Sequence, residues 1–314
     1  MADPADDARP RTLAARLYEI PALLGFLTAL FWAGNAIAGQ LAKGEIQPFM
    51  LVLVRWVAVA LMLWPLFGHE VRAYWHVARP KFWRIVLTAL TGFTVFNALF
   101  YVASLSTGAV NIGIFQGAIP IFVLIGTFLI YGDRVGPIQA LGVAVTLVGV
   151  VLVATRGDLA TALALGLNQG DGMMLMACVC YAAYTVALRG RPDMPGRAFF
   201  TLMCPIAAVA SVPFAVGEAL VTGGSWPTAT GWLVAAYVAV FPSCLSQLFF
   251  LRAVDLIGPG RAGVYINLVP VLAACLAVLL LGEVFRWYHA AALVLVLGGI
   301  WLAQRPAPAA TAKR

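Results

Sequence analysis

The sequence predicts an all-α integral membrane protein whose ten transmembrane helices form two inverted five-helix repeats. Hydrophobic residues make up 62% of the 314 residues and charged residues only 11%, against roughly 45–50% and about 25% in soluble domains. The apolar residues are gathered in ten runs, each close to the roughly 20 residues that cross the hydrocarbon core. The chain also matches itself at a fixed offset. Composition alone therefore excludes a soluble fold.

The ten apolar runs are separated by short polar connections. We expect spans near residues 20–42, 48–67, 85–105, 108–131, 136–155, 171–188, 198–216, 231–251, 260–281 and 287–303. The apolar middle of the connection at 156–170 is too short to cross, so we expect this segment at the membrane interface. The predicted organisation is a tail (1–19), a first repeat (20–155), a connecting loop (156–170), a second repeat (171–303) and a tail (304–314).

Lysine and arginine predict the orientation, because cytoplasmic loops carry an excess of both. With the N-terminus inside, sixteen of the twenty fall on the cytoplasmic side. They are Arg9, Arg11, Arg16, Arg72, Arg79, Lys81, Arg84, Arg134, Arg189, Arg191, Arg197, Arg252, Arg261, Arg305, Lys313 and Arg314. Only Lys43, Arg156 and Arg286 fall opposite. We expect a multi-pass protein of the cell (inner or plasma) membrane with both termini cytoplasmic.

Several classes of protein are not supported by the sequence. The net charge of +7 is explained by the loops, so no nucleic-acid partner is expected. The five cysteines lie inside apolar runs, without metal-ligand or disulfide spacing. There is no phosphate-binding lysine motif and no reactive intramembrane cluster. We expect no catalytic residues, no metal and no cofactor, and hence not an enzyme.

An internal repeat relates the two halves of the chain at an offset of 150 residues. It aligns FYVASLSTGAVNIGIFQGAIP (100–120) with FLRAVDLIGPGRAGVYINLVP (250–270), and Pro120 with Pro270. Glycines match in register as well, among them Gly113 with Gly263. Five helices per repeat is an odd number, so the second copy enters the membrane from the opposite side. Inverted repeats are typical of secondary transporters, which hold substrate near the midplane and work by alternating access.

The same stretches resemble the EamA family of the drug/metabolite transporter superfamily. The resemblance rests on Phe31-Trp32-Ala33-Gly34-Asn35, on Leu53-Val54-Arg55-Trp56, and on a proline followed by a Gly-acid helix exit in both repeats. It covers about residues 22–154 and 172–303, with Asp133 where glutamate is more usual. Within the family, the chain is most similar to exporters of amino acids and other metabolites, including the aromatic amino-acid type. We expect a monomer in the lipid bilayer whose partner is a small-molecule substrate.

Polar side chains within the spans are the candidate site residues, because they are costly in a bilayer unless they are paired or face water. Trp32 and Asn35 share one helical face, as do Asn97 and Tyr101, and Asn97 aligns with Gln247 across the repeat. Two amides facing a shared axis suit the polar backbone of an amino acid. The alternative is that these residues only join helices.

A second group of candidates lies in spans four, six and nine. These residues are Gln116, Tyr181, Tyr184, Tyr265 and Asn267. Aromatic edges and amides suit a wide, mostly apolar cavity with a few polar anchors, although tyrosines also form belts at the membrane interface. Pro120 and Pro270 are candidate hinges, since a proline frees a backbone carbonyl and lets a helix bend.

Arg55 is the only charge predicted within a span, and it either meets an anionic substrate group or pairs structurally; its uncharged counterpart in span seven favours the structural role. No Asp or Glu is predicted at mid-span, which favours a facilitator or coupling through another group. The expected function is secondary export of small metabolites, above all aromatic or neutral amino acids. The alternatives are a channel-like facilitator and a carrier of sugar-nucleotides or drugs.

Overall fold

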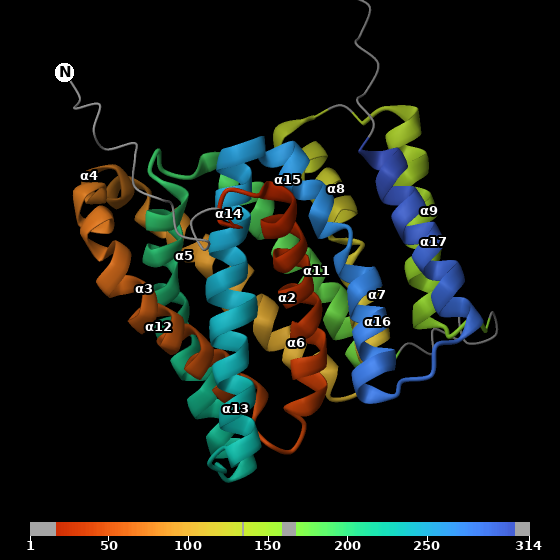
Figure 1. Cartoon of the computed structure of the whole chain (residues 1–314), viewed down its shortest axis with the longest axis horizontal. Coiled ribbons are helices and arrows are strands. Elements are labelled where there is room, and N and C mark those ends of the chain that lie inside the picture. The colour runs from red at the N-terminus through yellow and green to blue at the C-terminus, as the bar shows by residue number, and fades with distance from the viewer. Residues whose placement is uncertain (1–16, 134, 159–167, 305–314) are drawn as a thin grey trace, which may run out of the picture.

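The computed structural model describes residues 17–133, 135–158 and 168–304, and within these ranges all regular structure is helical (Figure 1). Nine helical stretches in this part of the chain are long and apolar enough to cross a membrane. Trp287–Ala303, with 17 residues, is a shorter apolar helix at the place of the tenth predicted span. The all-α membrane fold is confirmed. The predicted interface segment lies mostly at 159–167, outside the described residues.

In the first repeat, each predicted span is helical. Its elements are α2 (Pro21–Leu41), α3 (Pro48–Ala73), α4 (Trp75–Ala78), η2 (Arg79–Lys81), α5 (Phe82–Ala89), η3 (Leu90–Val95), α6 (Phe96–Ser104), α7 (Ala109–Gln116), α8 (Ile119–Tyr131) and α9 (Pro137–Ala154). The segment between spans two and three was predicted as a connection. It is helical instead, because α3 continues to Ala73 and the next helical stretch begins at Trp75.

The second repeat has the same order of spans, but it lacks counterparts of α4 and η2 and has a short turn, η4 (Leu188–Gly190), after its first helix. Its elements are α11 (Gln169–Ala187), η4, α12 (Gly196–Thr222), α13 (Ala229–Val238), η5 (Ala239–Leu245), α14 (Ser246–Ile257), α15 (Pro259–Ile266), α16 (Val269–Leu281) and α17 (Trp287–Ala303). Figure 1 shows α3 and α12 side by side at one edge of the bundle and α9 and α17 at the other.

Spans four and nine are each divided into two helices at matching positions. The break falls between α7 and α8 at residues 117–118, and between α15 and α16 at 267–268. At each break, backbone hydrogen bonds join residues three apart, as in a 3₁₀ turn. Examples are Ala118 N–H to Phe115 O (2.9 Å) and Leu268 N–H to Tyr265 O (3.0 Å). Pro120 and Pro270 stand in the first turn of α8 and α16, where a proline is tolerated because that N–H has no helical partner.

Spans three and eight share a different irregularity. Each contains a π-helical segment, η3 (Leu90–Val95) in the first repeat and η5 (Ala239–Leu245) in the second. Residues 90–95 fall on 240–245 at the repeat offset, so the two segments coincide. Single π-helical turns inside α-helices are frequent at functional sites, and these two lie in the middle of the bundle.

The helix pairs at the two edges of the bundle hold the repeats together. α9 and α17 approach closely because small residues line their contact. A Cβ on Gly142 would collide with the backbone around Gly299 and Ala303, and one on Gly149 would collide with α17 as well. Small residues that let two backbones approach are the usual means of packing helices in lipid, where no hydrophobic force drives them together.

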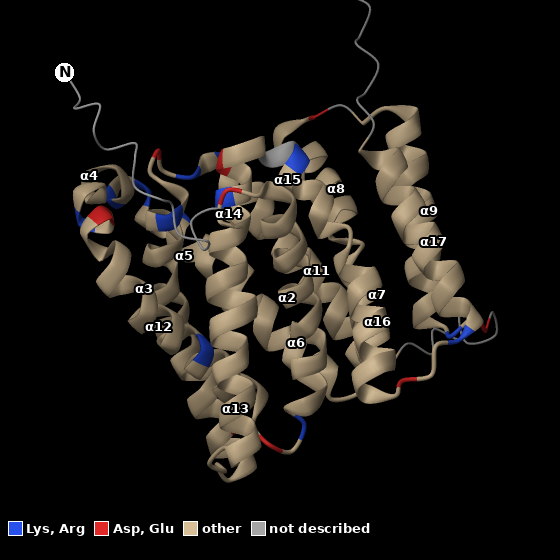
Figure 2. Ribbon diagram, viewed as in Figure 1, with Lys and Arg blue, Asp and Glu red and all other residues tan. Residues whose placement is uncertain are grey.

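The described lysines and arginines are divided between the two ends of the bundle as the sequence predicts (Figure 2). One end, called the Asp133 end below, carries Arg72, Arg79, Lys81, Arg84, Arg189, Arg191, Arg197, Arg252 and Arg261. The other, called the Glu283 end, carries Lys43, Arg156 and Arg286. Arg55 lies between them, inside the bundle.

Candidate functional site

A cavity of about 630 Å³ lies between the two repeats. Its walls come from α2 and α3, from the π-helical regions of spans three and eight, from α11, and from both sides of the breaks in spans four and nine. The volume is within the roughly 300–1,000 Å³ that is usual for small-molecule sites. Most of the lining is apolar, and it includes Phe93, Phe96, Ile119, Val123 and Ile266.

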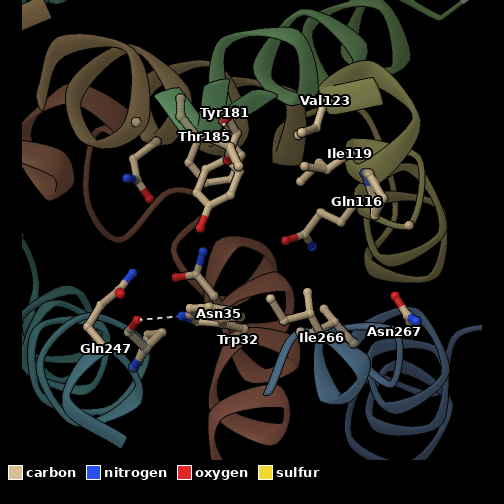
Figure 3. Close-up of a pocket in the computed structure, with 18 of the residues that line it drawn as sticks. Trp32, Asn35, Gln116, Ile119, Val123, Tyr181, Thr185, Gln247, Ile266 and Asn267 are labelled. Carbon is tan, nitrogen blue, oxygen red and sulfur yellow. Dashed lines mark hydrogen bonds between the residues drawn. The ribbon is translucent and has the colours of Figure 1, made fainter. Parts of the chain in front are cut away.

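A few polar side chains project into this space from different helices. Figure 3 shows Asn35 from α2, Gln116 from α7, Tyr181 from α11 and Gln247 from α14 around the same opening. The Nε2 atom of Gln116 is buried and has no hydrogen-bond partner among the described residues. An unpaired buried donor costs about 1–3 kcal/mol.

Arg55 reaches the cavity from α3, seven residues after Pro48 and therefore about 10 Å along the helix. It is buried, with 5% of its surface exposed. Its Nε donates to Ser243 Oγ (2.6 Å), and its Nη1 lies 2.7 Å from Asn97 Oδ1, 2.7 Å from Tyr101 OH and 3.2 Å from Asn35 Oδ1. These acceptors belong to α2, α6 and η5, so one guanidinium joins four helices.

Two tryptophans satisfy carbonyls in the π-helical segments. Trp32 Nε1 donates to Pro242 O (3.1 Å), and Trp56 Nε1 donates to Phe93 O (3.1 Å). A π-helical turn displaces carbonyls from regular helical bonding, and buried carbonyls need a donor. Trp32 also lies against Phe250, with ring centroids 5.7 Å apart. The predicted site residue Trp32 thus lines the cavity and supports its wall.

The structure brings most of the predicted site residues together. Those that line the cavity are Trp32, Asn35, Arg55, Asn97, Gln116, Pro120, Tyr181, Gln247 and Asn267. Tyr101 lies behind them, bonded to Arg55 and donating to Asn35 Oδ1 (2.8 Å).

Besides Tyr101, three predicted residues lie outside the lining. Tyr184 packs against Gly92 and Phe93, and Tyr265 packs on Gly25 in α2. Pro270 is buried beside Gly117. Tyr181 and Tyr184 are only three residues apart, yet the first faces the cavity and the second faces a neighbouring helix.

Several wall residues were not predicted from the sequence. They include Thr185, Phe93 and Pro242, and behind the wall the Ser243 hydroxyl accepts a hydrogen bond from Arg55. The π-helical segments change the helical phase, so the face that residues 92 and 242 present does not follow from regular spacing. The repeat itself was the available signal, because Gly92 and Pro242 occupy equivalent positions.

The cavity is closed at the Glu283 end. There α7 packs against α16, and the Glu283 carboxylate accepts hydrogen bonds from Ala109 N (2.7 Å) and Val110 N (3.1 Å) at the start of α7. Glu218 similarly accepts from Phe49 N and Met50 N (both 3.0 Å) at the start of α3. Carboxylates are favourable at helix N-termini, where backbone N–H groups are unpaired.

The opposite end of the cavity is open between the repeats. Its walls there include Val123 of α8, Thr185 of α11, Val264 of α15 and Gln304 after α17, all toward the Asp133 end. α8 and α15 line facing parts of the cavity, whereas their counterparts α16 and α7 are packed together. The structure therefore represents a state that is open at one end.

In the described part of the chain, nine membrane-length helices and a shorter tenth form two repeats with a cavity between them, which is an architecture typical of membrane transporters. The chain belongs to the EamA-like transporter family, whose sequence pattern matches residues 19–155 and 168–304. Each match covers one repeat, so the family assignment accounts for nearly the whole chain.

Relatives of known sequence agree with this assignment. Over 216 residues the chain is 27% identical to the uncharacterized transporter YyaM of Bacillus subtilis, covering 68% of this chain and 70% of that one. It is 27% identical to an uncharacterized transporter of Archaeoglobus fulgidus over 290 residues, 89% and 96% of the two chains. A protein of known crystal structure shares the fold, with a TM-score of 0.62 and 20% identity over 90% of this chain and 96% of the other.

Proposed function

We propose that this transporter exports small metabolites, above all amino acids with aromatic or neutral side chains, by alternating access. The observation that carries the proposal is the cavity, which lies between the inverted repeats and is closed at one end. Its largely apolar walls suit an aromatic or aliphatic side chain, and its amides, hydroxyl and single cation suit the polar backbone of an amino acid. A monomer contains the whole cavity.

The charge distribution supports an orientation for this cycle. The Asp133 end carries most of the described lysines and arginines (Figure 2), so it is assigned to the cytoplasm, with both termini on that side. The cavity then faces the cytoplasm, where an exporter takes up its substrate. The outward-facing state would arise when spans four and nine exchange their roles, as inverted repeats permit.

The closed Glu283 end favours a carrier over a channel. A channel provides one continuous path, whereas here α7 and α16 pack together beyond the midplane. In purified protein reconstituted into liposomes, a carrier shows saturable uptake and accelerated exchange when unlabelled substrate is loaded inside. Uptake that does not saturate and is not accelerated by counterflow would support a channel-like facilitator.

The charge of the cavity lining favours amino acids over more highly charged metabolites. Arg55 is the one charged side chain that lines it in the described part of the chain. Sugar-nucleotides carry two phosphate charges, for which arginine and lysine clusters are the usual partners. Amino acids need no more than one cation and a few polar groups. A liposome assay with L-tryptophan, L-phenylalanine, L-leucine, an amine and a nucleotide sugar tests this choice; transport of another class while all amino acids fail would refute it.

We expect that transport is not coupled to protonation of a carboxylate in the cavity. No Asp or Glu lines the cavity among the described residues, and buried carboxylates are the usual proton carriers in transporters. We expect counterflow to proceed in liposomes without a pH gradient. A strict requirement for such a gradient would contradict this part of the proposal and would direct attention to other groups.

A further inference from the structure

Arg55 is a buried cation whose protein partners are all neutral. The groups that accept its hydrogen bonds are the side chains of Ser243, Asn97, Tyr101 and Asn35. Ion pairs elsewhere in the described chain, Arg189–Asp133 and Arg197–Glu70, lie at the Asp133 end. A buried charge without a counter-ion is costly in a low-dielectric interior. Some negative group that the described chain does not supply would lower that cost.

The groups around Arg55 are held as acceptors by their own hydrogen bonds. The Ser243 hydroxyl donates to Val238 O, and Asn97 Nδ2 donates to Phe93 O (2.6 Å). The Tyr101 hydroxyl donates to Asn35 Oδ1 (2.8 Å). Since these donors are directed to other acceptors, the oxygen atoms are left to face the guanidinium. The arrangement fixes the guanidinium in place, as a preorganised binding site requires.

Part of the guanidinium is left for another partner. Nε and Nη1 make all four hydrogen bonds, while Nη2 makes none with the described residues and is not among their buried unpaired atoms. Asn35 also has a donor left over. Its Oδ1 accepts two hydrogen bonds, from Arg55 and Tyr101, whereas its Nδ2 has no partner among the described residues. Arg55 and Asn35 both line the cavity, and Figure 3 shows the amide of Asn35 projecting into it.

From this geometry we infer that Arg55 binds the carboxylate of the transported molecule, with Asn35 as the second donor. The inference rests on the proposed function, and it makes a negatively charged carboxylate the common feature of the substrates. A carboxylate has two oxygens and one charge, which match two free donors and one cation. A phosphate dianion would remain half neutralised, because no other cation lines the cavity in the described chain.

The site lies at the closed end of the cavity. Arg55 is about 10 Å from the start of α3, near the packed Glu283 end, while the opening lies beyond Thr185 and Val264. A substrate would therefore enter carboxylate first and leave its side chain among Phe93, Phe96 and Ile119. The amino group would lie within reach of the acceptor oxygens of neighbouring amides such as Gln116.

The test compares ligands of similar shape in which a carboxylate is replaced by a neutral amide. Binding of phenylacetate and of phenylacetamide to the purified full-length protein is measured by calorimetry in detergent, together with L-phenylalanine and L-phenylalaninamide. The wild-type protein is expected to bind each carboxylate at least tenfold more tightly than its amide. Equal affinity for both members of each pair would overturn the inference without any variant.

Two substitutions examine the site from opposite directions. Arg55→Gln is expected to weaken carboxylate binding at least tenfold and amide binding less than twofold. Asn35→Asp keeps the arginine and adds an internal counter-ion, so it is expected to abolish the carboxylate preference while the protein remains folded. The matched control is Arg72→Gln, an exposed arginine in the last turn of the same helix, which should leave the preference unchanged.

The outcomes separate this inference from the proposed function. If amino acids are transported but Arg55→Gln and Asn35→Asp retain the carboxylate preference, Arg55 only joins helices and the inference is wrong. If no amino acid is transported but phenylacetate binding still requires Arg55, the inference holds and the proposed substrate is wrong. A proportionate loss of both ligands in each pair would also indicate a purely structural arginine.

Discussion

The two repeats end spans four and nine with the same Gly-acid motif, but the two acids have different partners. Glu283 caps the start of α7 and joins one repeat to the other. Asp133 pairs with the side chain of Arg189 in the second repeat (2.6 Å) and caps no helix in the described chain, and 40% and 49% of these two side chains are exposed. At the equivalent of Ala109 the second repeat has Pro259, which has no N–H to donate. The comparison teaches that a symmetric plan can hold one end closed and leave the other open.

Among the substitutions at the two ends, removal of the Glu283 carboxylate should lower stability most. Glu283→Ala deletes two hydrogen bonds to a charged acceptor, each worth about 1.5–3 kcal/mol, and weakens the contact between repeats. We expect a marked fall in the thermal unfolding midpoint in detergent. Asp133→Ala, the matched change at the other end, should lower the midpoint less, because an exposed ion pair is screened by water. Equal losses would show that the two ends are equivalent.

The same pair of variants should differ in access to the cavity. A reporter cysteine at Thr185, in a protein whose native cysteines are alanine, lies in the wall toward the Asp133 end. Glu283→Ala should slow its labelling by a membrane-impermeant thiol reagent, since it favours the oppositely open state. Asp133→Ala should leave the rate near that of the parent. Faster labelling in Glu283→Ala would contradict the role of Glu283 in closing its end.

A matched glycine pair gives the next largest effect. A Cβ on Gly113 would lie 2.5 Å from Ala273 Cβ at the packed end, whereas one on Gly263 meets nothing within 4 Å. Gly113→Ala should therefore lower stability by about 1–3 kcal/mol through overpacking, while Gly263→Ala should not. We expect Gly263→Ala to slow transport all the same, because α15 must pack closely in the exchanged state. Normal transport by Gly263→Ala would argue against that exchange.

The smallest effects are expected at the two π-helical segments, which lie at matching positions of the two repeats. Trp32→Phe and Trp56→Phe each remove one indole donor from a π-helical carbonyl. Each carbonyl keeps another donor, Ser246 Oγ (2.5 Å) on Pro242 O and Asn97 Nδ2 (2.6 Å) on Phe93 O. Each change should cost about 1 kcal/mol, measured as a shift in the unfolding midpoint. A loss as large as that of Glu283→Ala would show that mid-bundle carbonyls, rather than the ends, limit stability.

Much of the fold could be predicted because hydrophobicity and a repeat are properties of the chain itself. Run length gave the spans, and the Pro120–Pro270 register anticipated irregular backbone at matching depths. The partners of Arg55 could not be predicted in the same way. They lie 20 to 188 residues away along the chain, and only the packed bundle brings them together. From the sequence, the uncharged counterpart of Arg55 in span seven favoured a structural arginine, and none of these partners could be named.

The tyrosines show a second limit of sequence reasoning. Tyr181 and Tyr184, three residues apart, were both expected in the cavity, but helical spacing does not fix where the boundary between cavity and neighbouring helix falls. Gly92 leaves room for Tyr184 against span three, which removes it from the cavity wall. Likewise, the same Gly-acid motif gave no sign that Glu283 and Asp133 would bond differently. The difference lies in what faces each acid.

The paired π-helical segments also govern rotation about the helix axis. Each residue of an α-helix advances its side chain by about 100°, so one added residue turns everything beyond it by that amount. The segment Leu90–Val95 therefore separates the orientation of α5 from that of α6. As a result, α5 packs against its neighbours while α6 directs Asn97 toward Arg55. Deleting one residue there would turn Asn97 away by about a quarter of a circle. The two π-helical segments thus set the direction in which the polar side chains that follow them point.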